Sequence, residues 1–464
     1  MHLDSVQVVE ELARANLADP RLKRRLRSLA QRLVARPALS FPEQMKSSAE
    51  LEAAYRFFGN VAVTSEAILA GHYDSVRVRC ARESCALVIH DSTVFNFRGD
   101  GRRTARDKPL PLQRFFAHAA LVISDDEHRR PLGVAGLEIW YRDLKKKGEE
   151  YGRWWRMVQT ASSRLERAKL VHVMDREADD YLLFHRLTED QHRFIVRTRA
   201  INGHSRLLAD GKLTRLDQAL ATLDTVVERD VKLAQRRKKN TKLHDHIHPP
   251  RESRRTALSI AAMQVPIRRP KRHPKQTAER RAMDLPASVT VNVVRVWEAA
   301  PPPGEKPVEW VLFTSEPIET TEQILSVVDR YRARWSIEEF FKALKSGCAF
   351  ESRQLEDFDG LSNALAVFAP IACTLLDLRS EARRNPDAPT HLPAAQLEVL
   401  RHMGRLPLPP SPSQREVLLA IAAMGGHIKY NGDPGCLTLS RGYAELTLLT
   451  SAWVTAQLQQ ARDQ

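Results

Sequence analysis

The sequence has few cysteines, and their spacing indicates neither a disulfide framework nor a zinc site. The chain has 464 residues and five cysteines, and no CxxC pair occurs. The cysteines are Cys80, Cys85, Cys348, Cys373 and Cys436. An odd number at scattered positions argues against a disulfide-stapled secreted fold. A reducing compartment is the expected environment.

Two further absences narrow the class of protein. No run of about 18 apolar residues is present, so the sequence predicts no membrane span. The first twenty residues carry acids and lack the apolar core of a signal peptide. We therefore expect a cytoplasmic location. No GxxxxGK[ST] loop occurs, which argues against a nucleotide-hydrolysing motor and predicts no nucleotide cofactor.

The chain has a large excess of positive charge. It contains 72 Lys and Arg against 57 Asp and Glu, for a formal net charge of +15 at pH 7. Such a field favours a polyanionic partner, of which nucleic acid is the commonest. A solvated basic protein without such a partner remains an alternative on charge alone.

The first 60 residues predict helices. Four leucines recur at helical spacing, and arginines and lysines fill the other faces. The leucines are Leu22, Leu26, Leu29 and Leu33. Pro37 should end this helix, Ser47 and Glu50 should form a capping box before the next, and Gly59 should end that one. The basic helix suits docking on DNA, although a plain bundle with a charged outer face fits equally well.

From about residue 79 the pattern changes to short apolar runs that alternate with helical segments. The strand-like runs cover residues 85–89, 115–125, 134–143, 169–174 and 192–200, and a helix is expected over 178–187. This alternation predicts a mixed α/β domain. Two of the runs end at acids, namely Asp91 and Asp175.

Residues 200–305 have the composition of a β-rich insertion with long basic loops. Two strand-like runs, at 255–267 and 288–298, adjoin stretches rich in Lys, Arg, His and Pro. His244, His246 and His248 alternate, but no paired ligands support a metal site there. A solvated or phosphate-facing loop is the better interpretation.

A long helix is expected from Thr320, which forms a capping box with Gln323, to about residue 346. Glu338 lies on it, and Tyr331, Arg334 and Lys345 follow at helical offsets. At about 100° per residue these four side chains would share an arc of roughly 60°. That face suits a carboxylate beside phosphate-binding cations. Beyond residue 360 the chain is again mostly helical.

Three carboxylates in this setting are candidates for a metal site that acts on phosphodiesters. In-line displacement develops charge on both the attacking and the leaving oxygen, and two Mg²⁺ ions can stabilise both. Mg²⁺ prefers oxygen ligands, which explains Asp and Glu in place of His or Cys. Taken one at a time, an acid at a strand end or on a helix is more often structural or solvent-facing.

Two motifs resemble those of a known family. Residues 175–179 read DREAD, and residues 331–345 read YRARWSIEEFFKALK, which fits Y-x2-R-x3-E-x6-K. Together they resemble the DDE transposases of bacterial insertion sequences, in the subgroup that includes the transposon-five transposase. The likeness also takes in AYRFFGN at 54–60, DST at 91–93, RFIVR at 193–197, EWVLFTSEP at 309–317 and MGGHIKYNGDPG at 424–435.

The resemblance implies three domains. Residues 1–70 would form a helical DNA-binding domain. Residues 71–360 would form a ribonuclease H-like catalytic core, interrupted by the β-rich insertion at about 200–305. Residues 361–464 would form a helical dimerisation region.

The resemblance also implies the catalytic residues. Asp91, Asp175 and Glu338 would be the catalytic triad and would hold Mg²⁺, with Mn²⁺ as a possible substitute. The spacing from Tyr331 selects Glu338 over its neighbour Glu339.

Five further residues would contact DNA in such an enzyme. Tyr331, Arg334 and Lys345 would hold the DNA end near the cleaved phosphate, and Arg197 would add another cation. Trp310 would stack on a base flipped out of the duplex. Core packing at the start of a strand is the alternative role of Trp310.

The activity implied is cut-and-paste DNA transposition. The enzyme would nick the end of the element, form and reopen a hairpin, and join the freed 3′-OH to target DNA. Its partners would be double-stranded DNA at the transposon ends and at the target, bound by a homodimer. Two alternatives stay open: a nuclease of the same fold that cuts without joining, and a catalytically silent DNA-binding inhibitor of transposition.

Overall fold

The computed structural model describes most of the chain, in two compact units. The residues described are 5–97, 104–105, 108–109, 113–141, 150–198, 206–209, 212–236, 249–270, 284–390, 392–428 and 433–460. The first unit consists of Met1–Lys146, Gln159–Lys169 and Trp335–Gln464, and the second of Lys147–Val158 and Leu170–Arg334.

The first unit begins with helices, as the sequence predicts. They are α1 (Ser5–Ala13), α2 (Pro20–Ala35), α3 (Phe41–Gln44), α4 (Ser48–Phe58) and α5 (Ser65–Ala81). The expected leucine stripe of α2 is confirmed, since Leu26, Leu29 and Leu33 are buried. The Ser47 hydroxyl caps α4 by accepting from the Glu50 amide. The Glu50 carboxylate accepts from Lys46 N instead of completing a capping box.

A three-stranded antiparallel meander follows in the first unit. It consists of β1 (Ala86–Asn96), β4 (Arg114–Ser124) and β5 (Pro131–Trp140). Between β1 and β4 in the sequence, two short strands pair antiparallel, β2 (Thr104–Ala105) and β3 (Lys108–Pro109). β1 stays paired with β4 as far as Asn96, which lies opposite Arg114. The expectation that Asp91 ends its strand is therefore wrong: Asp91 lies in mid-strand, opposite Ala119.

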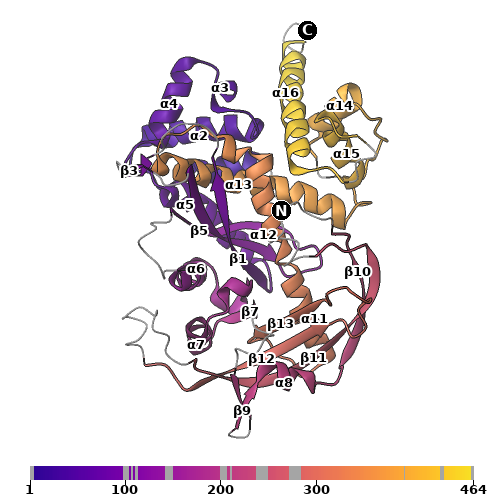
Figure 1. Ribbon diagram of the computed structural model, residues 1–464. Coiled ribbons are helices and arrows are strands. Elements are labelled where there is room, and N and C mark those ends of the chain that lie inside the picture. The colour runs from indigo at the N-terminus through magenta and orange to yellow at the C-terminus, as the bar shows by residue number, and fades with distance from the viewer. Residues whose placement is uncertain are drawn as a thin grey trace. The chain divides into compact units, whose positions relative to one another are not determined.

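The C-terminal part of the first unit is helical, as expected. It contains α13 (Phe358–Arg384), α14 (Ala394–Met403), α15 (Gln414–Met424) and α16 (Cys436–Gln460), and Figure 1 shows the last three grouped together. α13 packs against α5, β5 and α15. By length and composition alone its segment Phe358–Ser380 could cross a membrane, but 89% of the most apolar window in this segment is buried inside the protein. That burial is typical of a core helix.

The long helix expected from Thr320 to residue 346 is wrong in its continuity. The Thr320–Gln323 capping box is present, but the segment divides into α11 (Thr321–Arg332), α12 (Trp335–Lys342) and a wide π-turn (Ala343–Gly347). The amide of Arg334 bonds Tyr331 O in place of an i−4 carbonyl. Consequently the four signature residues do not lie on one helix: Tyr331 is on α11, Arg334 follows its end, Glu338 is on α12 and Lys345 is in the π-turn. The break coincides with the boundary between the two units.

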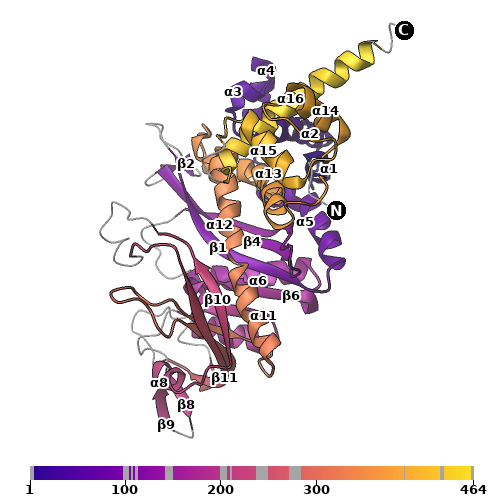
Figure 2. The ribbon, with the colours of Figure 1, turned by 90° about the vertical axis from the view of Figure 1, so that its right-hand side faces the viewer.

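The second unit is built on a mixed sheet with strand order β6-β7-β13-β12-β11-β8-β9, and β10 pairs with β11. The strands are β6 (Leu170–Met174), β7 (Arg193–Arg197), β8 (Arg206–Ala209), β9 (Lys212–Arg215), β10 (Val227–Leu233), β11 (Arg254–Arg268), β12 (Ser288–Trp297) and β13 (Glu309–Thr314). β6 and β7 are parallel, and the other pairs are antiparallel. α11 packs against β7, β12, β11 and β6, and Figure 2 shows it to the right of β10 and β11.

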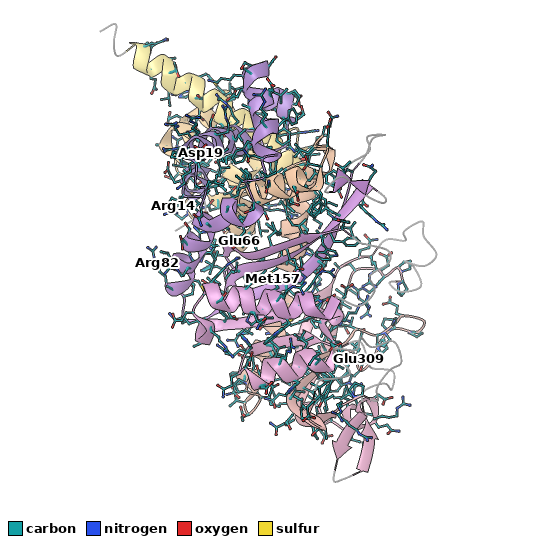
Figure 3. The ribbon with its side chains drawn as sticks, turned by 90° about the vertical axis from the view of Figure 1, so that its left-hand side faces the viewer. Arg14, Asp19, Glu66, Arg82, Met157 and Glu309 are labelled. Carbon is teal, nitrogen blue, oxygen red and sulfur yellow. The ribbon has the colours of Figure 1, made fainter. Side chains whose placement is uncertain are left out.

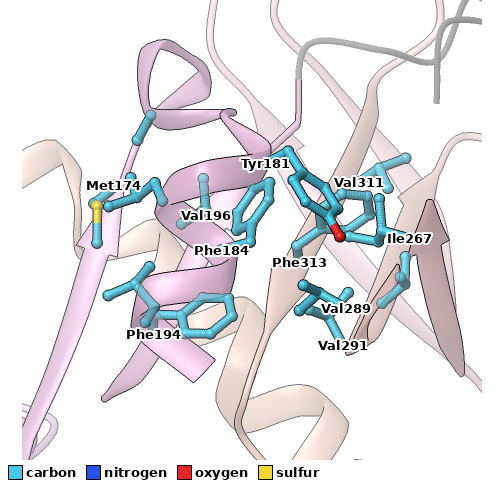
Figure 4. Packing of buried hydrophobic residues seen from close by; sticks show 14 of the residues in the cluster. Met174, Tyr181, Phe184, Phe194, Val196, Ile267, Val289, Val291, Val311 and Phe313 are labelled. Carbon is cyan, nitrogen blue, oxygen red and sulfur yellow. The ribbon is translucent and has the colours of Figure 1, made fainter. Parts of the chain in front are cut away.

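Helices and the sheet enclose the core of the second unit. The helices are α7 (Tyr181–Glu189), α8 (Leu216–Ala221) and the first part of α6 (Glu150–Arg164). Phe184 of α7 packs on Phe194 and Phe313, with Val291 and Ile267 in the same cluster (Figure 4). β-branched and aromatic residues at alternate positions explain these strands.

Strands are present in the segment expected to be a β-rich insertion, since β8 to β12 all fall between residues 206 and 297. Its two basic loops lie mostly outside the described residues, at 237–248 and 271–283, and so do His244, His246 and His248.

Candidate active site

Asp175 in the second unit stands where a buried strand ends, as the sequence predicts. β6 is buried along its whole length, and Asp175 follows its last residue. The Asp175 carboxylate caps the short turn Arg176–Ala178 by accepting from Glu177 N at 2.8 Å. One oxygen is thereby oriented by the backbone, and the side chain stays half-buried.

The last acid of the DREAD motif has a structural partner that sequence reasoning missed. The hydroxyl of Thr198, which is 5% exposed, donates to Asp179 at 2.8 Å. Thr198 directly follows β7, so this bond ties the DREAD turn to the end of the strand that carries Arg197. The motif itself was the only signal available, because Thr198 lies 19 residues away.

Tyr331 lies at the centre of a polar cluster in the second unit. Its side chain is only 5% exposed. Burial raises the pKa of the Tyr331 hydroxyl, and the Asp175 carboxylate raises it further. Arg197, which bonds the hydroxyl, and Arg334 lower it in part. These effects put Asp175, Arg197 and Arg334 within electrostatic reach of one phenol, which stays protonated and can donate a hydrogen bond.

Trp310 and Arg197 complete this cluster from two neighbouring strands. The Trp310 ring on β13 meets the Tyr331 ring edge-on, with 5.5 Å between the ring centroids. Arg197 ends β7, and its Nη2 donates to the carbonyl of Glu309 at 3.4 Å; Glu309 is labelled in Figure 3. Both side chains are half-buried. A partly open indole beside two guanidiniums is suited to stacking and phosphate contacts.

Buried ion pairs hold α11, and therefore Tyr331, against the sheet. The carboxylate of Glu316, 2% exposed, accepts two bonds from Arg193 of β7, at 2.9 and 2.6 Å, and one from Arg330 of α11. On the other side, Asp329 of α11 forms a two-point pair with Arg229 of β10. Sequence reasoning assigned none of these supporting roles. The pairs of Glu316 with Arg193 and of Asp329 with Arg229 join segments 100 or more residues apart.

In the first unit, Asp91 and Glu338 lie on two elements that pack together. Asp91 is in the middle of β1, and Glu338 is in the first turn of α12, which contacts β1. In Figure 2, α12 runs beside β1 and β4. Both carboxylates are half-buried, and Asp91 Oδ1 accepts from Ser92 N at 2.8 Å.

The neighbouring glutamates of α12 have different environments. Glu339 is 8% exposed; it pairs with Arg379 of α13 and accepts from Lys342 Nζ at 2.9 Å. Its carboxylate is committed to anchoring α12. Glu338, at the preceding position of the helix, is half-buried. The choice of Glu338 over Glu339 rests on motif spacing and stays a prediction.

Lys345 lies in the π-turn that follows α12. Its Nζ is 5.5 Å from the ring centroid of Phe95 on β1. Burial lowers the pKa of the Lys345 ammonium, and Glu351 partly opposes this. Glu351 in turn accepts from the amide of Asn96, at the end of β1. The cation is thus held beside the strand that carries Asp91.

The structure therefore divides the predicted site residues between its two units. Asp175, Arg197, Trp310, Tyr331 and Arg334 gather in the second unit, and Asp91, Glu338 and Lys345 belong to neighbouring elements of the first. Among the described residues, no group of three or more His, Cys, Asp or Glu side chains forms a ready-made metal site. The candidate ligands are all half-buried carboxylates, an oxygen donor set that suits a hard divalent cation.

Comparison with known families gives two matches. Residues 7–63 match the transposase DNA-binding family, and residues 157–369 match the transposase DDE domain. The first range covers nearly all of α1 to α4. The second contains Asp175, Glu338 and the five candidate DNA contacts, whereas Asp91 lies outside it.

Among solved structures, one similar chain is that of the cryo-EM structure of the piggyBac transposase synaptic complex with hairpin DNA. The match covers 82% of the present chain and 65% of that chain, with 10% sequence identity and a TM-score of 0.32. So low a similarity supports no conclusion about fold or function.

Proposed function

We propose that the chain is an active cut-and-paste DNA transposase of the insertion-sequence type. Residues 7–63 match the transposase DNA-binding family, and residues 157–369 match the transposase DDE domain. The observation that carries the proposal is the cluster around Tyr331 inside the DDE range. There a carboxylate, two guanidiniums and an indole lie within reach of one phenol.

The proposed catalytic acids are Asp91, Asp175 and Glu338, on a proposed ribonuclease H-like core. Their side chains are half-buried carboxylates, so they fit a divalent cation, and Mg²⁺ is the proposed ion with Mn²⁺ as a substitute. When bound, the metal would stabilise charge on the attacking and leaving oxygens.

The other residues of the site would bind and orient DNA. Arg334 and Lys345 would hold phosphates beside the cleaved bond, and Arg197 would add a third cation. The Tyr331 hydroxyl, which burial keeps protonated, would donate to a phosphate oxygen. The half-buried indole of Trp310 would stack on an unpaired base.

The proposed reaction is a series of displacements at phosphorus, and each is balanced by itself. In the first, a water oxygen bonds to phosphorus, the P–O3′ bond of the element's end breaks, and a 3′-OH is released. That 3′-OH then attacks the opposite strand, which closes a hairpin and releases the flanking DNA. Water reopens the hairpin, and the 3′-OH finally attacks a target phosphate. Each step exchanges one P–O bond for another, so no external energy source is needed.

The proposed assembly is a homodimer that holds two transposon ends. The N-terminal helices would bind the ends, since residues 7–63 match the DNA-binding family. Arg21, Lys23 and Arg24 are exposed on α2 and can contact the phosphate backbone. Affinity should then fall steeply with salt concentration.

The direct test is incubation with DNA that carries the element's own ends, in Mg²⁺ and in EDTA. We expect nicked, hairpin and joined products in Mg²⁺ only. Joined products are decisive, because a nuclease of the same fold would stop at cut DNA. Binding without cleavage in either Mg²⁺ or Mn²⁺ would contradict the proposal and indicate a silent inhibitor.

A further inference from the structure

Arg353 in the first unit is a fully buried cation with an unusual set of acceptors. It is 2% exposed. Its guanidinium donates to three backbone carbonyls, those of Pro37, Leu39 and Cys348. The first two acceptors are more than 300 residues away in the sequence, so this one side chain joins distant parts of the first unit.

Aromatic rings line the same pocket. The guanidinium carbon is 5.1 Å from the ring centroid of Phe41 and 4.5 Å from that of Phe368. Burial lowers the pKa of Arg353 to about 10, so the group remains charged at neutral pH. A charge buried at this depth depends on its hydrogen bonds, because an unpaired donor there is costly.

The three acceptors belong to two functional segments. Pro37 and Leu39 lie in the link after the basic helix α2, within the match to the DNA-binding family. Cys348 closes the π-turn, since its amide bonds Ala343 O at 2.8 Å. Lys345 lies inside that turn.

The guanidinium therefore bridges the end-binding segment and the turn that carries an active-site cation. If the link at residues 37–39 shifted away from Cys348, at least one buried donor would lose its acceptor. The guanidinium of Arg353 is planar and donates its hydrogen bonds in fixed directions, so it tolerates such a shift poorly. The two segments are thus constrained to move together.

We infer that Arg353 is a positioning residue that makes the placement of Lys345 depend on the docking of the N-terminal helices. The inference rests on the proposed function, in which Lys345 holds a DNA phosphate. Through Arg353, engagement of the transposon end by α2 is communicated to the turn beside β1.

The first test is a double-mutant cycle between Arg353→Lys and Lys345→Ala in the full chain, by single-turnover cleavage of end DNA. We expect Arg353→Lys to slow cleavage roughly tenfold in the wild-type background and less than about twofold in the Lys345→Ala background. End affinity should change less than about threefold, because α2 keeps its exposed cations.

Arg79→Lys is the matched control. Arg79 is also buried, at 7% exposed, and donates to the carbonyl of Leu132 and to Glu11. It makes none of these contacts with the π-turn. The fold reductions in cleavage rate caused by Arg79→Lys and by Lys345→Ala should therefore multiply in the double variant. If Arg353→Lys does not fold, Phe41→Leu, which removes one ring over the guanidinium, takes its place in the cycle.

A second measurement does not depend on catalysis. Acetic anhydride labelling of the DNA-free protein, followed by mass spectrometry, reports the exposure of Lys345. We expect the labelling rate of Lys345 to rise at least about threefold in Arg353→Lys and to stay unchanged in Arg79→Lys.

The outcomes distinguish the inference from the proposed function. Suppose that the wild type cleaves ends, that the fold reductions in cleavage caused by Arg353→Lys and Lys345→Ala multiply, and that the labelling rate of Lys345 is unchanged in Arg353→Lys. The inference is then overturned, and the proposed function stands. If the wild type cleaves no DNA in Mg²⁺ or Mn²⁺, the proposed function fails and the inference fails with it.

Discussion

The two units of the chain carry different parts of the proposed catalytic set. The second unit surrounds one carboxylate, Asp175, with cations and aromatic rings. The first unit holds two carboxylates, Asp91 and Glu338, on β1 and α12, and one partly buried ammonium, Lys345. Guanidiniums and rings bind phosphates and bases, whereas carboxylates bind metal.

This contrast indicates that substitutions can change DNA binding and the rate of the chemical step separately. Each unit also has its own anchor for the helix that presents its residues. Glu316 holds α11 through Arg193 and Arg330, and Glu339 holds α12 through Arg379. Changes at the cations and rings of the second unit should act mainly on DNA binding, and changes at the three proposed catalytic acids should act mainly on the rate of the chemical step.

The largest effect is expected from Glu338→Gln. Loss of a proposed metal ligand should slow end cleavage on the order of a thousandfold or more, with little change in DNA affinity. Glu339→Gln is the control, and it should instead destabilise folding by about 3–5 kcal/mol, because it leaves Arg379 without its carboxylate. Single-turnover cleavage and chemical denaturation separate the two effects. Equal loss of cleavage per folded molecule in both variants would refute the assignment of Glu338.

Next in size is Arg334→Ala in the second unit. Loss of a charged hydrogen bond to phosphate corresponds to about 1.5–3 kcal/mol, or roughly 10- to 100-fold weaker binding of end DNA. Arg332→Ala removes an exposed arginine two residues away that pairs with Asp329, and it should change binding less than about twofold. Gel-shift titration at fixed salt measures both. The contrast between the units breaks down if Arg334→Ala leaves affinity intact.

A smaller effect is expected from Trp310→Leu. If the indole stacks on a flipped base, its loss corresponds to about 1–3 kcal/mol, and 2-aminopurine placed at the end of the element should lose its flipped-out signal. Trp297→Leu is the control, since Trp297 lies on the adjacent strand β12 beside Arg295. Indistinguishable 2-aminopurine signals from the wild type and Trp310→Leu would mean that Trp310 serves core packing.

The smallest effect at neutral pH is expected from Lys345→Arg, less than about threefold, because both side chains are then charged. Burial lowers the pKa of Lys345 from its ordinary value of 10.5. The ammonium is therefore lost, and kcat/KM falls, as the pH rises through a value below 10.5. Arginine stays charged in that range, so in Lys345→Arg the fall of kcat/KM at alkaline pH should occur at a higher pH. Superimposable pH profiles would show that Lys345 does not govern the limb.

Local features of the fold could be predicted because their hydrogen bonds join residues that are close in sequence. Ser47 caps α4, and Thr320 forms a capping box with Gln323, each within a single turn. The leucine stripe of α2 is equally local. Motif spacing likewise selects Glu338 over Glu339, and this choice stays a prediction.

Features that depend on distant partners could not be predicted from periodicity. β1 continues past Asp91 because β4 pairs with it to the end. The helix expected over residues 320–346 breaks where the anchoring of α11 by Glu316 gives way to the anchoring of α12 by Glu339. The role of Arg353 was equally hidden, since its partners lie over 300 residues away.

The central claim is that the proposed cleavage needs Asp91 and Asp175 in the same chain. Mixing Asp91→Ala with Asp175→Ala, each inactive alone, and assaying end cleavage in Mg²⁺ tests it most directly. The account predicts no recovery of cleavage at any mixing ratio, because neither chain has a complete set of acids. Recovery to an appreciable fraction of wild-type cleavage would contradict it, since the two acids would then act from different chains or different sites.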